Sequence, residues 1–218
     1  MTLSCTQVPA ALAAAFSDSA VCAMLEMIVD AWPAARQRAE RLPRKIEVPI
    51  NRVLKAAITQ SPRFRASLFE LERELPLDDD TGEETGRIDL RFTSKDVAKG
   101  VCLVCECKRL RIPGKRNIDV GADAYVQGML RFFDRHAYGA GQRHGGMIGY
   151  VMDGRRDLAL RALQTRIGGT RTALGLRGQP ARRPLAPSSF LRGREEAHQS
   201  EHLRDQTPLT LHHLLLSW

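Results

Sequence analysis

Two expected strands carry the residues whose types and spacing are best suited to catalysis or metal binding. The first spans residues 87–92 and contains Asp89, and the second spans residues 101–108 and contains Glu106 and Lys108. Residues two apart on a strand share a face, so Glu106 and Lys108 project the same way. If Asp89 lies on the neighbouring strand, two carboxylates converge beside one lysine. Such a set can hold a hard divalent cation and keep a lysine near an attacking water, which is the chemistry of metal-assisted hydrolysis.

The same three residues also fit a structural interpretation. An acid on one strand and Glu-x-Lys on the next are typical of a cross-strand ion pair on a solvated sheet face. The two interpretations differ in burial, because a carboxylate and an ammonium are costly to bury without a purpose.

Three cysteines, Cys102, Cys105 and Cys107, crowd into the second strand and suggest a thiolate metal site as an alternative. Alternation argues against it, because Cys102 faces away from Cys105 and Cys107 and the sequence holds no second cysteine pair. We expect buried small hydrophobic side chains instead. The chain has 5 cysteines, an odd number that favours reduced thiols and a cytoplasmic location over a disulfide framework.

A second metal alternative involves His198 and His202, which lie four residues apart with Glu201 beside the second. On a helix these histidines would share a face. The surrounding segment is irregular in pattern, so the alternative is the weaker one.

Positive charge is concentrated in the second half of the chain. Residues 1–100 hold 14 Lys and Arg against 15 Asp and Glu, whereas residues 101–218 hold 19 against 10. A basic surface beside a carboxylate site predicts a polyanionic substrate held by its phosphates. A solvated arginine-rich face is the alternative. The densest run of cations is made of Lys108, Arg109, Arg111, Lys115 and Arg116.

The periodicity of apolar residues predicts an α/β protein. Helices and strands alternate in an order that favours a mixed sheet with helices on its faces. The expected helices span residues 10–41, 47–60, about 119–137 and 156–167. The expected strands span residues 63–77, 87–92, 101–108, 145–152, 190–195 and 209–216.

Other classes of protein are disfavoured by composition. No apolar run reaches the length of a membrane span, and the apolar residues 9–16 lack the preceding basic residues of a signal peptide. The P-loop pattern GxxxxGK[ST] does not occur in the sequence. If the activity needs loading or unwinding of nucleic acid, an ATPase or helicase subunit must supply it.

Asp89 and the tripeptide Glu106-Cys107-Lys108 resemble the bipartite signature of the PD-(D/E)xK, or restriction-endonuclease-like, nucleases. The resemblance covers about residues 47–155, and Arg87-Ile88 stands where the signature has its proline. Residues 125–133 and 146–151, together with 200–204 and 211–214, are similar to small bacterial proteins of anti-phage or mobile-element systems.

The resemblance implies a restriction-endonuclease-like mixed central sheet flanked by helices. It implies one nuclease-like domain over residues 1–218, with a core at about 47–167, an N-terminal helical extension at 1–46 and a basic C-terminal region at 168–218 packing on the core.

The resemblance also implies roles for individual residues. Mg²⁺ or Mn²⁺ would be held by Asp89, Glu106 and the backbone carbonyl of Cys107, while Lys108 would orient the attacking water. Glu47 matches an additional glutamate that binds or positions a second metal or water, and Gln127 a polar residue on the following helix. Backbone phosphates would be held by Arg109, Arg111, Lys115 and Arg116.

We therefore expect a cytoplasmic, metal-dependent nuclease that hydrolyses phosphodiester bonds, with DNA the favoured substrate and no membrane association. The expected setting is the effector subunit of a bacterial defence system with an ATPase or helicase partner, and a homo-oligomer is compatible with it. The alternative is a nucleic-acid-binding or assembly subunit with a nuclease-like fold that does not cleave.

Overall fold

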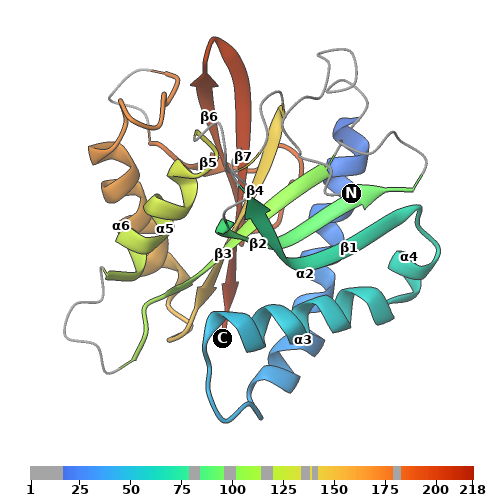
Figure 1. Ribbon diagram of the computed structural model, residues 1–218. Coiled ribbons are helices and arrows are strands. Elements are labelled where there is room, and N and C mark those ends of the chain that lie inside the picture. The colour runs from blue at the N-terminus through green and yellow to red at the C-terminus, as the bar shows by residue number, and fades with distance from the viewer. Residues whose placement is uncertain are drawn as a thin grey trace. The chain divides into compact units, whose positions relative to one another are not determined.

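Seven strands form a mixed sheet in the order β1-β2-β3-β4-β7-β6-β5 in the computed structural model (Figure 1). The structure describes residues 17–78, 84–95, 102–113, 120–133, 138, 142–178 and 183–218. The α/β class with helices beside a mixed sheet is confirmed, and its restriction-endonuclease-like subtype stays a prediction.

The chain divides into two compact units, and the division falls inside β3 (Cys102–Leu110). One unit takes Met1–Cys105 and Asp134–Gln142, and the other takes Glu106–Phe133 and Arg143–Trp218. The core expected at residues 47–167 therefore draws on both units. Residues 168–218 supply strands of the second unit's sheet.

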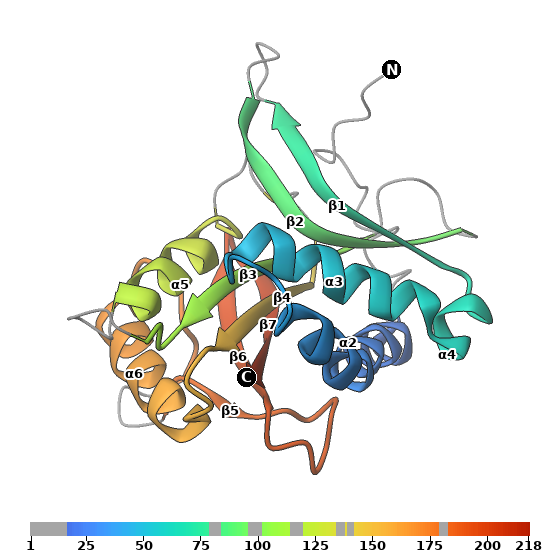
Figure 2. The same cartoon turned by 90° about the horizontal axis from the view of Figure 1, so that it is seen from below.

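In its described residues, the first unit contains helices α2, α3 and α4 and the β1-β2 hairpin. Helix α2 spans Asp18–Ala39, α3 spans Glu47–Gln60 and α4 spans Pro62–Arg65. Strand β1 (Phe69–Asp78) pairs antiparallel with β2 (Glu84–Ser94), which pairs antiparallel with the start of β3. Helix α3 packs against α2 on one side and against both hairpin strands on another (Figure 2).

Helix α2 keeps Pro33 inside it although a proline removes a backbone hydrogen bond. Ser17 caps its start by accepting a hydrogen bond from the Ala20 N–H at 3.2 Å. Tertiary packing then holds the helix past the proline, because Ala35 and Ala39 are fully buried. Residues 10–16 of the expected helix lie outside the described residues.

Helix α3 has the boundaries that the sequence predicts. Pro49 lies in its first turn, where a missing N–H is harmless. Ile50, Leu54 and Ile58 are fully buried and form the apolar face of the helix.

The expected strand at residues 63–77 is wrong at its start. Ser61 accepts a hydrogen bond from the Phe64 N–H at 3.2 Å, and Pro62 occupies the first helical position, so Pro62–Arg65 form the short helix α4. A serine cap followed by proline is a helix start signal that outweighs the alternation of Phe64 and Ala66. The strand begins at Phe69.

The second unit continues from β3 into helices that lie beside its strands. Helix α5 spans Val120–Leu130 and contacts β4 (His144–Val151), whereas α6 (Arg156–Gly169) contacts β7 (Thr207–Ser217). The two helices also contact each other, as both views show (Figures 1 and 2). Strand β7 runs parallel to β4 and antiparallel to β6 (Ala197–Arg204), which pairs with the short β5 (Ala186–Pro187).

Two expectations for this unit are wrong. Helix α5 ends at Leu130 and gives way to turns, rather than continuing toward residue 137, although residues 134–137 lie outside the described part. Residues 190–195 form turns instead of a strand, because the Ser188 hydroxyl accepts from the N–H groups of Phe190 and Leu191 and Gly193 takes a φ of 79°. The strand there is β6, which begins at Ala197.

No helix in the described ranges combines the length and apolar character that crossing a lipid bilayer requires.

We predict that Gly175→Ala destabilises the second unit. Gly175 has a φ of 51°, and a Cβ there would lie 2.2 Å from the Leu203 carbonyl oxygen, so the backbone must shift. We expect a loss of about 1–3 kcal/mol in the free energy of unfolding, measured by urea denaturation.

The matched control is Gly169→Ala, because nothing lies within 4 Å of a Cβ at that helical glycine. Its stability should be unchanged or raised by up to about 1 kcal/mol. Equal effects of the two substitutions would contradict the importance of the Gly175 conformation.

Candidate functional site

In the first unit, a buried amide from α3 reaches the carboxylate of β2. Asn51 is fully buried, and its Nδ2 donates a hydrogen bond of 3.2 Å to Oδ1 of the half-buried Asp89. Glu47 lies four residues before Asn51 on the same helix, so the two side chains share a face of α3. Asn51 was not among the expected site residues. Its only signal in the sequence is a polar residue in the apolar face of α3.

In the second unit, β3 buries its glutamate beside its lysine. The Glu106 side chain is 1% exposed, and the Lys108 Nζ donates to its Oε1 at 2.6 Å. The same ammonium donates to the Cys107 carbonyl oxygen at 3.1 Å. The expected common face of Glu106 and Lys108 is therefore confirmed, and the carboxylate is not on a solvated sheet face.

A second cation reaches Glu106 from the turn that follows α5. Arg131 Nη1 lies 3.4 Å from Oε1 and 3.5 Å from Oε2 of Glu106. Helix α5 passes close to β3, because a Cβ at Gly128 would lie 2.9 Å from the Glu106 Cγ. Gln127, the expected polar residue of this helix, is exposed. Gly128, the neighbour of Gln127, lies close to Glu106, and Arg131 reaches its carboxylate from the turn.

The two thiols that alternate with Glu106 on β3 face the core. Cys105 and Cys107 are fully buried, and burial raises the pKa of the Cys105 thiol to about 12, with the charge of Asp89 adding to the shift. A thiol with such a pKa stays protonated at neutral pH and is a poor metal ligand. Cys102, also buried, accepts a hydrogen bond from Gln142 Nε2 at 2.9 Å. The cysteines therefore behave as small hydrophobic residues.

Of the four residues expected to contact backbone phosphates, the structure describes Arg109 and Arg111. Arg111 is 9% exposed and donates through Nε to Asp153 Oδ2 at 2.7 Å, so this guanidinium ties the end of β3 to the turn after β4. Arg109 is half-buried. Lys115 and Arg116 lie outside the described residues.

The donors expected to hold a metal are all oxygen atoms, from the carboxylates of Asp89 and Glu106 and the carbonyl of Cys107. This chemistry fits a hard cation such as Mg²⁺, which keeps several waters and needs few protein ligands. Within the described ranges, no group of three or more His, Cys, Asp or Glu is placed to hold a metal ion. A dedicated all-protein cage is therefore not present in that part of the chain.

A buried polar chain crosses the second unit. The Ser200 hydroxyl lies 2.6 Å from His202 Nε2 and 2.7 Å from His213 Nε2. His202 Nδ1 lies 2.7 Å from the Leu174 carbonyl oxygen, and His213 Nδ1 lies 3.0 Å from the Tyr125 hydroxyl. All four side chains are at most 2% exposed. The sequence does not predict this chain, because the segment around His198 and His202 is irregular in pattern.

Burial fixes the protonation of the two imidazoles in this chain. It lowers the pKa of His202 to about 4 and the pKa of His213 well below 6.5, so both are neutral at pH 7. The Leu174 carbonyl can only accept, so His202 donates to it through Nδ1 and accepts from Ser200 through Nε2. Ser200 then accepts from His213 Nε2, and His213 Nδ1 accepts from Tyr125. The proposed His198–His202 metal pair is disfavoured, because both ring nitrogens of His202 are engaged.

We predict that stability falls as the pH drops from about 6.5 toward 4. An unfolded histidine titrates near 6.5, while the folded pKa is about 4 for His202 and about 3 for His212, both lowered mainly by burial. The unfolded state therefore binds protons first, so the stabilisation is complete above 6.5 and is lost as the pH falls.

The measurement is the free energy of unfolding in urea at pH 8, 7, 6 and 5. Carboxylates are still mostly ionised above pH 5, so this window reports the histidines. Equal stability at pH 7 and pH 5 would contradict the buried neutral state.

Comparison of the chain with protein-family models, with curated proteins and with solved structures finds no match.

Proposed function

We propose that the protein is a metal-dependent nuclease that hydrolyses phosphodiester bonds, with DNA the favoured substrate. The observation that carries the proposal is the buried Glu106 carboxylate, bound by Lys108 from its own strand and approached by Arg131. The other support is Asp89 in the first unit, whose carboxylate is fixed by a buried amide.

The energetics of Glu106 favour a chemical role. Desolvating a carboxylate costs several kcal/mol, and buried ion pairs are often no more stable than apolar residues of similar volume. The chain nevertheless buries Glu106 and keeps a glycine at position 128, where a Cβ would press on the carboxylate's own side chain. A buried carboxylate that adds little to stability is readily explained if Glu106 takes part in a reaction.

In the proposed mechanism, Asp89, Glu106 and the Cys107 carbonyl would hold Mg²⁺ or Mn²⁺. When bound, the ion supplies charge neutralisation at the phosphate and lowers the pKa of a bound water. The Lys108 ammonium orients the attacking water and offsets negative charge in the transition state. Asn51 is a positioning residue that fixes the orientation of the Asp89 carboxylate.

We predict that Glu106→Gln and Lys108→Met each lower metal-dependent cleavage of plasmid DNA by at least about 100-fold, because the first weakens a ligand of the metal and the second removes the group that orients the attacking water. Cleavage is measured with Mg²⁺, with Mn²⁺ and with excess EDTA. Glu72→Gln is the matched control, since Glu72 is a strand carboxylate paired with Arg91 in the β1-β2 hairpin. Cleavage that survives in the variant with both Glu106→Gln and Lys108→Met would reject the assignment.

We predict a milder effect for Asn51→Leu, which keeps the side-chain volume but removes the donor to Asp89. Cleavage should fall about 10-fold, and the Mg²⁺ concentration for half-maximal activity should rise, because the carboxylate is less well oriented. The KM for DNA should stay unchanged. A variant with lower activity but an unchanged Mg²⁺ requirement would indicate only a structural role for Asn51.

One observation favours a non-cleaving nucleic-acid-binding subunit as the second candidate. The Glu106 carboxylate is already neutralised by Lys108 and approached by Arg131, as a structural ion network would be. This candidate predicts DNA binding that weakens steeply with salt, without cleavage at any metal concentration. The role in bacterial defence, the ATPase or helicase partner, the homo-oligomer and the cytoplasmic location stay predictions.

A further inference from the structure

We infer that the first unit carries a binding surface for single-stranded DNA. The surface consists of the connection between α2 and α3, residues 40–46, and the exposed side of the first two turns of α3 (Figure 1). The choice of DNA rests on the proposed nuclease function, whereas the binding itself does not, because a strand can be held without being cut.

Positive charge is concentrated around this connection. Residues 36–55 hold 7 Lys and Arg against 2 Asp and Glu, whereas the rest of residues 1–100 hold 7 against 13. The three cations of the connection, Arg41, Arg44 and Lys45, are exposed, and so is Arg52 in the second turn of α3. A local excess of positive charge in an otherwise acidic stretch is suited to a polyanion.

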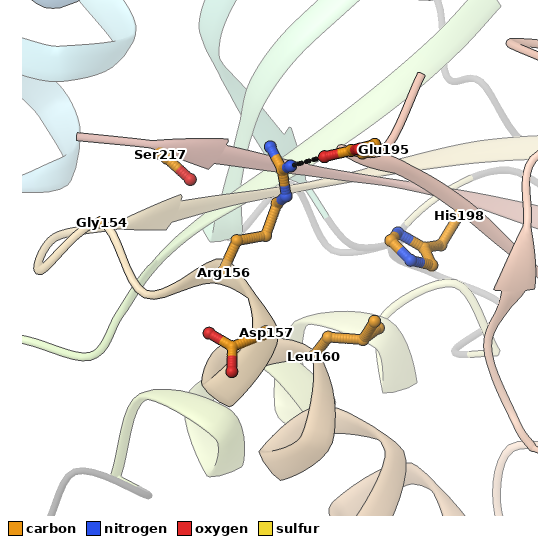
Figure 3. A pocket seen from close by; sticks show the side chains of 7 residues that line it. All are labelled: Gly154, Arg156, Asp157, Leu160, Glu195, His198 and Ser217. Atoms are coloured by element: carbon orange, nitrogen blue, oxygen red, sulfur yellow. Dashed lines mark hydrogen bonds and ion pairs between the residues drawn. The ribbon is translucent and has the colours of Figure 1, made fainter. Parts of the chain in front are cut away.

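Three of these cations are not matched by acids. The side chains of Arg41, Arg44 and Arg52 form no ion pair with another residue of the described ranges. Arg156 of the second unit shows the opposite arrangement, because its Nη2 binds Glu195 Oε2 at 2.7 Å (Figure 3). A phosphate that binds at the connection therefore displaces no carboxylate from these three guanidinium groups.

Apolar side chains are exposed among the same cations. Ile46 and Val48 are each 42% exposed, and they are two of the four large apolar side chains that the described residues expose. Both are β-branched and stiff, so they offer an apolar surface of fixed shape. A single strand leaves the apolar faces of its bases open to such contacts, whereas a duplex stacks them inside. Cations beside exposed apolar residues therefore favour a single strand.

The exposed side of α3 leads toward the carboxylate of β2. Val48 and Arg52 lie four residues apart, so they are neighbours on the helix surface. Glu47 and Asn51 form the adjacent row, and Asn51 Nδ2 donates to Asp89 Oδ1 at 3.2 Å. A strand that contacts Val48 and Arg52 therefore passes beside the helix face that reaches Asp89.

An anionic lipid surface is the other polyanion that such a combination can bind. A helix that binds at a lipid surface inserts its apolar face. The apolar face of α3, made of Ile50, Leu54 and Ile58, is fully buried within the protein. The two exposed aliphatic side chains alone leave little apolar area to insert, so the observations favour a nucleic acid.

The test is fluorescence anisotropy of the full chain with a labelled oligo(dT) of about 20 nucleotides, in excess EDTA to prevent cleavage. The oligonucleotide should bind at least about fivefold more tightly than a duplex of the same length. Equal or tighter binding of the duplex would overturn the choice of a single strand. Binding to phosphatidylcholine vesicles that contain phosphatidylglycerol, without binding to the oligonucleotide, would overturn the proposal in favour of a lipid surface.

Charge variants localise the binding. Arg44→Gln combined with Lys45→Gln should weaken oligo(dT) binding at least about 10-fold at about 50 mM salt. The slope of log affinity against log salt should become shallower by about 1.4, because each neutralised phosphate contributes about 0.7. The matched control is Arg36→Gln combined with Arg63→Gln, since both arginines are exposed and already paired with carboxylates. It should change the affinity less than about twofold. Equal effects of the two double variants would overturn the proposed surface.

The apolar contact has its own variant. Ile46→Thr combined with Val48→Thr should weaken oligo(dT) binding about threefold and leave the salt slope unchanged, because apolar area is lost while every charge stays. Threonine suits the cap position of α3 that Ile46 occupies, so the helix should be retained. Unchanged affinity in this variant would show that bases do not contact the surface and would overturn the single-strand assignment.

Cleavage assays with Mg²⁺ separate this inference from the nuclease proposal. A chain that binds oligo(dT) through Arg44 and Lys45 but never cuts DNA would sink the nuclease proposal and leave the binding surface standing. A chain that cuts DNA but binds oligo(dT) equally well without these two cations would overturn the binding surface alone.

Discussion

The buried charge of Glu106 sets the main constraint on the second unit around β3. A carboxylate that is 1% exposed needs cations and close cover, and both are supplied locally. Lys108 comes from the same strand face, Arg131 comes from the turn after α5, and α5 approaches closely because residue 128 is a glycine. Arg131 comes directly after the last residue of α5, three positions after Gly128.

β3 also shows how one strand separates two environments. Its thiols at Cys105 and Cys107 are fully buried, while its polar face holds a carboxylate and an ammonium in hydrogen-bonding contact. Alternation along the strand is sufficient for this separation. The strand ends at Leu110, and the next residue, Arg111, takes a φ of 51° and forms an ion pair with Asp153. An arginine that closes a strand in this way acts on the fold rather than on a ligand.

Local signals in the sequence predicted much of this fold. The bounds of α3 and the common face of Glu106 and Lys108 depend on prolines and on the alternation of side chains, which act over a few residues. Asn51, Arg131 and β6 could not be predicted in the same way. The roles of Asn51 and Arg131 depend on partners that lie 38 and 25 residues away in the sequence. Strand β6 places polar side chains in the interior, so its sequence lacks the alternation of apolar residues that predicts a strand. Hydrogen bonds between these side chains take the place of apolar contacts.

The buried chain from Tyr125 to the Leu174 carbonyl behaves as a single cooperative unit. Each neutral imidazole has one N–H, so the direction of every hydrogen bond in the chain is determined by the carbonyl at its end. Neither His202 nor His213 can change tautomer alone without leaving two donors or two acceptors facing each other. Helix α5, β6, β7 and the turn at Leu174 therefore share one hydrogen-bond alignment, and loosening any of them disturbs all four.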